Sequence, residues 1–265
     1  MTLANQTSGP PRSTIDGRPS GNVTPASHPD GAILTAATQA SSPSPWRTRW
    51  FFVCPVDRLA EDTCHVTVDL PELSITLQND RGTLIGFRNI CAHQSLPLRP
   101  AGFGRGLLRC QHHGWTYNAD GIPVGIPDDD ARVDLDLAGR TALALEPVGV
   151  AVIEGGVFAR VEDDDSLPDA KWLADTELAG AVQRLAIERP LPAGMAPPAE
   201  GATLGNLSID LMGDFALLGW IVPHGPAAIR ATVALYALAE APDEIPAETR
   251  TRYDKAARAL EQAAG

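Results

Sequence analysis

Short runs of alternating or clustered apolar residues, each bounded by turn residues, dominate the chain from Trp50 onward, a pattern typical of β-strands. The sequence Asn79-Asp80-Arg81-Gly82 lies between two of these runs and predicts a hairpin turn. Gly155-Gly156 marks a turn or bulge in a later run. On this ground we expect strands at residues 51–54, 64–68, 73–77, 83–87, 142–147 and 150–161. The first part of the ordered chain is therefore expected to be mainly β.

The last third of the chain, from about residue 166, contains both helix-like and strand-like spacings of apolar residues. Apolar residues at 173, 178, 182 and 185 suit an amphipathic helix over 172–188, followed by a proline-rich connector at 190–198. Strands are expected within 203–222 and 229–239. Pro246 opens a C-terminal helix to about Ala263, with its apolar side chains on one face. The expected fold of this region is α+β.

The first 45 residues have a different composition. They are rich in Ser, Thr, Pro, Gly and Asn and contain almost no aromatic residues. Such a segment cannot bury enough apolar surface to offset the entropy lost on ordering. We expect a disordered tail over 1–45, with order beginning near Trp46; a misassigned start codon would produce the same pattern.

Two short cysteine–histidine sequences carry the candidate chemistry. Cys91-x-His93 is followed after sixteen residues by Cys110-x-x-His113. Each pair supplies one thiolate and one imidazole, which suits a Rieske [2Fe–2S] centre with two thiolates on one iron and two imidazoles on the other. A structural Cys₂His₂ zinc site is the alternative, although zinc fingers usually place both cysteines in one pair. His112, between Cys110 and His113, is expected to be a loop residue rather than a ligand.

The residues around both pairs resemble one protein family. Two runs are similar to the two cluster loops of aromatic-ring-hydroxylating (Rieske non-haem iron) oxygenase α subunits. They are Phe87-Arg88-Asn89-Ile90-Cys91-Ala92-His93-Gln94-Ser95 and Cys110-Gln111-His112-His113-Gly114-Trp115-Thr116-Tyr117-Asn118-Ala119-Asp120-Gly121. Trp115 favours the oxygenases over the small Rieske ferredoxins. Leu96 and His112 stand where Rieske proteins of cytochrome bc complexes carry two bridged cysteines. The resemblance covers about residues 46–165.

The resemblance implies a Rieske domain over 46–165, an antiparallel β sandwich with the ligands in hairpin loops. It implies that Cys91, His93, Cys110 and His113 hold one [2Fe–2S] cluster and that the loop 121–127 covers it. Asp128-Asp129-Asp130, just beyond that loop, is expected to be a solvated turn. A ferredoxin or flavin reductase would donate electrons, and an oxygenase partner subunit or a homotrimer is the expected assembly.

The family's second metal site is not supported by this sequence. Family members hold a mononuclear Fe(II) by two histidines and a carboxylate in a downstream helix-grip domain. After His113 this chain has one histidine, His224, which is expected to be structural. Either 206–213 is an eroded form of the ligand motif, or the helix carrying it is deleted. We favour deletion because 215–222 has a strand pattern, which makes 166–265 a shortened remnant with Asp210 and Asp214 at its surface or turns.

Composition narrows the function further. The net charge is −12, from 33 acidic and 21 basic residues, which argues against nucleic-acid binding. No apolar stretch long enough to span a membrane occurs, and Cys54 and Cys64 are expected to be free thiols of a cytoplasmic protein. The sequence predicts a Rieske oxidoreductase of the ring-hydroxylating type. The alternative is a non-catalytic electron-transfer or redox-sensing accessory subunit.

Overall fold

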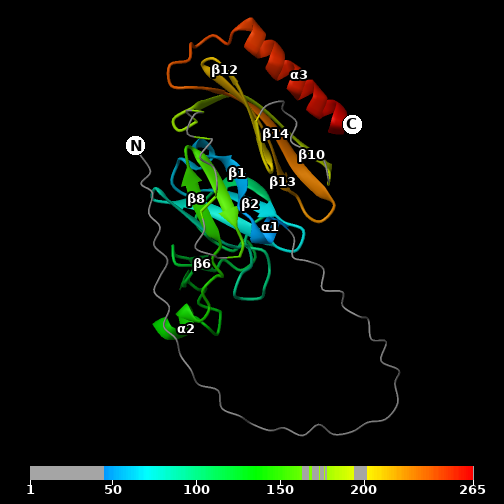
Figure 1. Ribbon diagram of the computed structural model, residues 1–265. Coiled ribbons are helices and arrows are strands. Elements are labelled where there is room, and N and C mark those ends of the chain that lie inside the picture. Colours follow the sequence, from blue (N-terminus) through cyan, green and yellow to red (C-terminus); the bar gives the residue numbers. More distant parts are fainter. Residues whose placement is uncertain are drawn as a thin grey trace, which may run out of the picture. The chain divides into compact units, whose positions relative to one another are not determined.

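The computed structural model describes residues 45–162, 167–168, 173, 176, 178–193 and 202–264 (Figure 1). The expected tail lies outside these residues apart from Pro45. In the part that is described, no helix is both long and apolar enough to cross a membrane. The fold is mainly β and built from antiparallel sheets, as the sequence predicts.

The first part of the chain folds into two small sheets. One has the order β1-β9-β8 and the other the order β4-β3-β2-β5. Their strands are β1 (Phe51–Pro55), β2 (Cys64–Asp69), β3 (Ser74–Asp80), β4 (Thr83–Arg88), β5 (Gly102–Arg105), β8 (Gly149–Ile153) and β9 (Gly156–Arg160). The strands predicted at 51–54, 64–68, 73–77, 83–87 and 150–161 are thereby confirmed. So is the β3–β4 turn, where Arg81 and Gly82 both have positive φ, as a two-residue hairpin turn requires.

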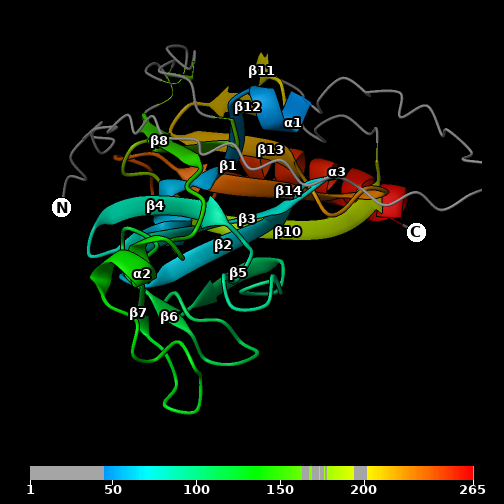
Figure 2. The ribbon, with the colours of Figure 1, turned by 90° about the horizontal axis from the view of Figure 1, so that it is seen from below.

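Smaller elements complete this part. They are α1 (Pro45–Thr48), the 3₁₀ helix η1 (Val56–Leu59), the two-stranded pair β6 (Thr116–Tyr117) and β7 (Pro123–Gly125), and α2 (Leu137–Thr141). In both views, β6, β7 and α2 lie at the end of the molecule remote from the C-terminal helix (Figures 1 and 2). The candidate ligands lie in the loops that surround β6.

The C-terminal part is a five-stranded antiparallel sheet of order β10-β14-β13-β12-β11. Its strands are β10 (Val182–Pro192), β11 (Ala202–Leu204), β12 (Leu207–Met212), β13 (Phe215–Pro223) and β14 (Ala228–Ala237). The helix α3 (Ala247–Ala264) packs on β10 and β14. Both the late strands and the C-terminal helix match the sequence prediction.

Strand β13 is buried along its whole length because both faces of the sheet are covered. Leu218 and Trp220 point into a core shared with Phe52 of β1, and the Phe52 and Trp220 rings meet edge to face at 5.8 Å. The alternate residues, such as Leu217, pack with Tyr253 of α3. A strand covered on two sides needs apolar residues at every position, which explains its unbroken apolar sequence.

Two predicted elements are wrong and a third is wrong in part. Residues 182–188 of the predicted helix belong to β10, an edge strand whose register with β14 shifts between Gln183 and Leu185. Because of this shift and the half-exposed edge position, apolar and polar residues do not alternate strictly along β10. The spacing of its apolar residues therefore resembles that of an amphipathic helix. Residues 190–192 of the predicted proline-rich connector are the last residues of the same strand. Residues 142–147 form no strand, and only Pro147 makes an isolated bridge, to Phe87. The chain there is leaving α2, which Asp136 caps by accepting a hydrogen bond from the Gly139 N–H.

Asn206 joins the C-terminal sheet to β1. Its side chain accepts a hydrogen bond from the Phe52 N–H (3.0 Å) and donates to the carbonyls of Phe52 (2.6 Å) and Ile221 (2.7 Å). The interpretation of 206–213 as an eroded helical motif is wrong, because 207–212 is strand β12. Asp210 on that strand pairs with Arg252 of α3 at 3.0 Å. Asp214 is exposed in the β12–β13 turn, as expected.

We expect Asn206→Ala to lower the free energy of unfolding by about 2–4 kcal/mol, because it leaves three buried backbone groups without their partner. Ser208→Ala is the matched control. Ser208 is also fully buried on β12 but donates one hydrogen bond, to the Gly219 carbonyl, so we expect a loss of about 1 kcal/mol. Urea unfolding of both variants measures the difference; equal losses would contradict the bridging role of Asn206.

Candidate iron–sulfur centre

Each cysteine–histidine pair lies in a tight turn closed by backbone hydrogen bonds. In the first turn, the Cys91 N–H donates to the Leu96 carbonyl and the Ser95 N–H to the Cys91 carbonyl, at 2.8 and 2.9 Å. In the second, the Cys110 N–H donates to the Trp115 carbonyl at 2.8 Å. Gly114 closes it with a φ of 78°, a conformation that glycine adopts without strain. These turns fix the direction in which the thiol and imidazole of each pair leave the backbone.

The two thiols are buried together in a separate apolar cluster. Cys91 and Cys110 are 1% and 2% exposed and pack with Trp115 and Tyr117. The Tyr117 hydroxyl accepts a hydrogen bond from the Ala92 N–H and lies 3.1 Å from Cys91 Sγ. A Cys91 thiolate can only accept, so in that state the Tyr117 O–H is the donor of this bond.

Burial raises the pKa of the Cys91 thiol, and the Tyr117 hydroxyl and the His93 backbone N–H act in the opposite direction by stabilising the thiolate. Burial, together with the neighbouring Cys91, raises the pKa of Tyr117. Tyr117 thus keeps its proton and remains a donor when Cys91 is deprotonated.

The two imidazoles lie side by side nearer the surface. The rings of His93 and His113 meet edge to face with centroids 4.7 Å apart. The His93 side chain is 13% exposed, whereas His113 is exposed. His112 is also exposed, and its ring centroid lies 6.4 Å from that of His113.

The two nitrogens of His93 have different surroundings. Nε2 lies 3.3 Å from Asp130 Oδ2, whereas Nδ1 is buried and has no partner among the described residues. A buried imidazole nitrogen without a partner is costly unless it serves a further group. Because Nε2 faces the carboxylate at this distance, Nδ1 is the ring nitrogen left free to act as a metal ligand.

The residues fit a [2Fe–2S] cluster of the Rieske type. Two buried thiols, two adjacent imidazoles and the unpartnered Nδ1 of His93 are the donors that such a cluster requires. Over the described residues, no three His, Cys, Asp or Glu side chains converge closely enough to hold a single metal ion. A pair of donors at each of two irons is a different arrangement from the single four-donor group of a zinc site.

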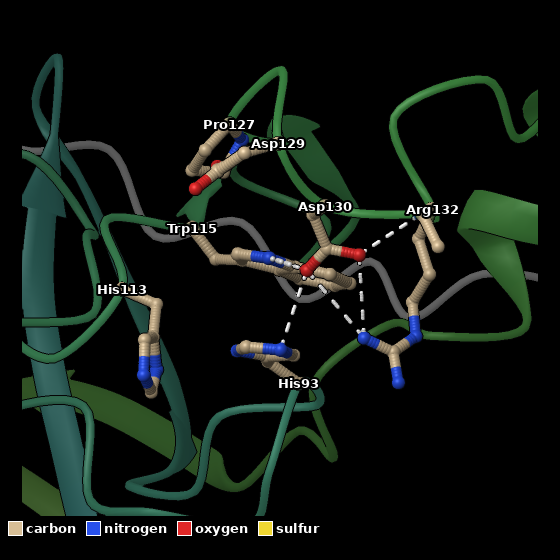
Figure 3. A pocket seen from close by; sticks show the side chains of 8 residues that line it. His93, His113, Trp115, Pro127, Asp129, Asp130 and Arg132 are labelled. Carbon is tan, nitrogen blue, oxygen red and sulfur yellow. Dashed lines mark hydrogen bonds and ion pairs between the residues drawn. The ribbon is translucent and has the colours of Figure 1, made fainter.

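Asp130 is part of this site, and the prediction that it belongs to a solvated turn is wrong. Asp128 and Asp129 are exposed, but the Asp130 side chain is 9% exposed. It accepts hydrogen bonds from Trp115 Nε1 (3.0 Å) and from the Arg132 N–H (2.8 Å), and it faces His93 (Figure 3). No sequence signal separates it from its two identical neighbours; its burial depends on Trp115 and His93.

The Asp130 carboxyl is held in its ionised form. Its burial acts to raise the pKa, but the hydrogen bonds from Arg132 and Trp115 and the charges of Arg132 and His93 outweigh burial, so the pKa is lowered. Trp115 stacks on His93 with ring centroids 5.2 Å apart and planes inclined by 7°. The Arg132 guanidinium lies 5.7 Å from the centroid of the same indole. Trp115 therefore shields one face of His93 while directing the carboxylate to its edge.

Two cavities meet at His113. One, of about 490 Å³, is lined by His93, His113, Trp115 and the loop of Pro127 to Arg132. The other, of about 460 Å³, runs along the second ligand turn from Arg109 to Gly114. The imidazole side of the site is thus the side with cavities at its surface.

Arg99 is a second residue that the sequence did not single out. It is buried, and its guanidinium donates to Gln78 Oε1 at 2.6 Å and to the carbonyls of Gly106 and Leu107. Burial lowers its pKa to about 10, so it stays charged at neutral pH. It holds the segment between the two ligand turns against β3.

Comparison with known proteins agrees with this geometry. The sequence matches the Rieske [2Fe-2S] domain family over residues 49–144. It is 30% identical over 116 residues to the glycine betaine monooxygenase oxygenase subunit of Chromohalobacter salexigens, which covers 43% of this chain and 25% of that protein. It is 31% identical over 126 residues to the terminal oxygenase component CarAa of carbazole 1,9a-dioxygenase from Sphingomonas sp., covering 46% and 32%. The matches thus span a quarter to a third of these relatives.

Solved structures share the fold over a longer stretch. The quaternary ammonium Rieske monooxygenase CntA in complex with gamma-butyrobetaine superposes with a TM-score of 0.61 at 14% identity, covering 82% of this chain and 75% of that one. Naphthalene 1,2-dioxygenase from Rhodococcus sp. gives 0.59 at 17% identity, with the same coverage. At these identities the likeness concerns the fold. The chain therefore contains a Rieske [2Fe–2S] domain at residues 49–144 and is homologous there to the oxygenase subunits of Rieske oxygenases.

Proposed function

We propose that this protein is a Rieske [2Fe–2S] oxidoreductase of the ring-hydroxylating-oxygenase type that accepts electrons from a ferredoxin or flavin reductase. The observation that carries the proposal is the donor set: two buried thiols beside two adjacent imidazoles, one with a buried, unpartnered Nδ1. The Rieske domain match over 49–144 supports it.

In this proposal Cys91 and Cys110 bind one iron, and His93 and His113 bind the other. When bound, the cluster supplies one-electron transfer. The chain's own residues prepare the site for it. Tyr117 donates a hydrogen bond towards the Cys91 sulfur, Trp115 excludes water from one face of His93, and the exposed His113 faces the approach of a partner.

We further propose that the Rieske domain spans 46–165 and that 166–265 is a shortened remnant of a catalytic domain without its own mononuclear Fe(II) site. The proposal is supported by the count of one histidine after His113. That residue, His224, lies in the β13–β14 turn, where its Nδ1 is 3.5 Å from Arg230. Oxygenation would then require iron held by a different, oxygenase partner subunit or by a ligand set that the sequence does not reveal. Inter-subunit electron transfer is described for CntA.

We expect Cys110→Ser and His113→Ala to abolish the visible absorption and the electron paramagnetic resonance signal of the cluster, because each removes one ligand. His112→Ala is the matched control, since it removes the neighbouring exposed imidazole. His224→Ala is a second control. Spectra of anaerobically purified protein measure the outcome; loss of the cluster in either control variant would show the ligand assignment to be wrong.

We expect purified protein to contain about two irons and two acid-labile sulfides per chain, the content of one cluster. Iron, sulfide and zinc analysis of the anaerobically prepared protein tests this. A third iron would contradict the loss of the mononuclear site. Zinc without sulfide would overturn the iron–sulfur proposal altogether.

A further inference from the structure

Hydrogen bonds of both the backbone and the side chain hold Asp130 in place independently of His93. Its backbone N–H donates to the Pro127 carbonyl and its own carbonyl accepts from Val133, both at 3.0 Å. Its side chain accepts from Trp115 Nε1 and from the Arg132 N–H. The carboxylate therefore has a set position that does not depend on His93.

One carboxylate oxygen of Asp130 contacts both Trp115 and His93. Oδ2 of Asp130 lies 3.0 Å from Trp115 Nε1 and 3.3 Å from His93 Nε2, and the two rings are nearly parallel. Trp115 therefore lies against the face of the His93 ring, and Asp130 lies at its outer nitrogen. The contacts of Asp130 with Trp115 and Arg132 already hold its loop, so the contact with His93 is additional to them.

The two imidazoles are unequal in this respect. His93 has a carboxylate at its outer nitrogen, whereas His113 is exposed and has no hydrogen-bonding partner within the described ranges. A carboxylate that accepts a hydrogen bond from a ligating imidazole makes the imidazole a stronger electron donor and fixes its orientation. Stronger donation and a nearby negative charge both favour the oxidised state of a metal centre.

We propose that Asp130 is a positioning residue that fixes the Nδ1-ligating form of His93 and lowers the reduction potential of the cluster. The inference rests on the proposed function. Arg132, which pairs with Asp130 at 3.3 Å, moderates the effect by compensating part of its charge. The chain thus carries within its own Rieske domain a group that sets the potential through one of the two imidazoles.

The test compares Asp130→Asn with Asp129→Asn in the full-length protein with its cluster. Both variants remove one negative charge at adjacent positions, but only Asp130 contacts His93. Asparagine keeps an acceptor for Trp115, so the loop is expected to stay in place. A redox titration followed by electron paramagnetic resonance should show a higher midpoint potential for Asp130→Asn and a clearly smaller change for Asp129→Asn. Equal shifts, or no shift at position 130, would overturn the proposal.

Arg132→Gln provides a test of opposite sign. It leaves the carboxylate in place but removes its compensating charge, so the midpoint potential should fall below that of the unmodified protein. Simple damage to the loop would move both variants in the same direction, and an unchanged or raised potential in Arg132→Gln would refute the inference even where Asp130→Asn fails to retain its cluster. Failure of the proposed function is separately visible, because the unmodified protein would then show no cluster spectrum.

Discussion

The ligand site depends on one backbone hydrogen bond between the two turns, from the Gln111 N–H to the Leu98 carbonyl at 3.1 Å. Two pairs of ligands far apart in sequence serve one cluster only if their turns keep a fixed separation. Asn89 holds the segment that contains Leu98. Its side chain accepts a hydrogen bond from the N–H of the next residue, Arg99, and donates one to the Arg99 carbonyl. The buried Arg99 then ties the same segment to Gln78 of β3. The position of the ligands is thus set by polar groups buried beneath the turns.

The solvent exposure of the candidate ligands also increases from the thiols to the imidazoles. The thiols lie in an apolar cluster, and the imidazoles lie at the surface beside two cavities. Trp115 and Tyr117, on either side of Thr116, contact different halves of the ligand set. Tyr117 acts on Cys91, and Trp115 acts on His93 and Asp130.

The sequence predicted features that depend on local chemistry. The β3–β4 hairpin was predictable because positive φ demands particular residues, and Cys91, His93, Cys110 and His113 could be proposed as ligands because metal-ligand spacing is short-range. Their role as ligands stays a prediction. What the sequence could not predict depends on distant partners. Asp130 differs from Asp129 only through Trp115 and His93, and β10 imitates a helix because its pairing with β14 is formed by residues some fifty positions away.

The C-terminal sheet is covered on both of its faces. Its central strands need cover on two faces: β1 and its neighbours supply one, through Phe52 and the Asn206 hydrogen bonds, and α3 supplies the other, through Tyr253 and Leu260. In the described region the faces of β13 and β14 are thus occupied by structural side chains. The sheet packs against the Rieske domain through β1, whereas the two cysteine–histidine turns lie in the loops around β6, remote from α3 (Figure 1).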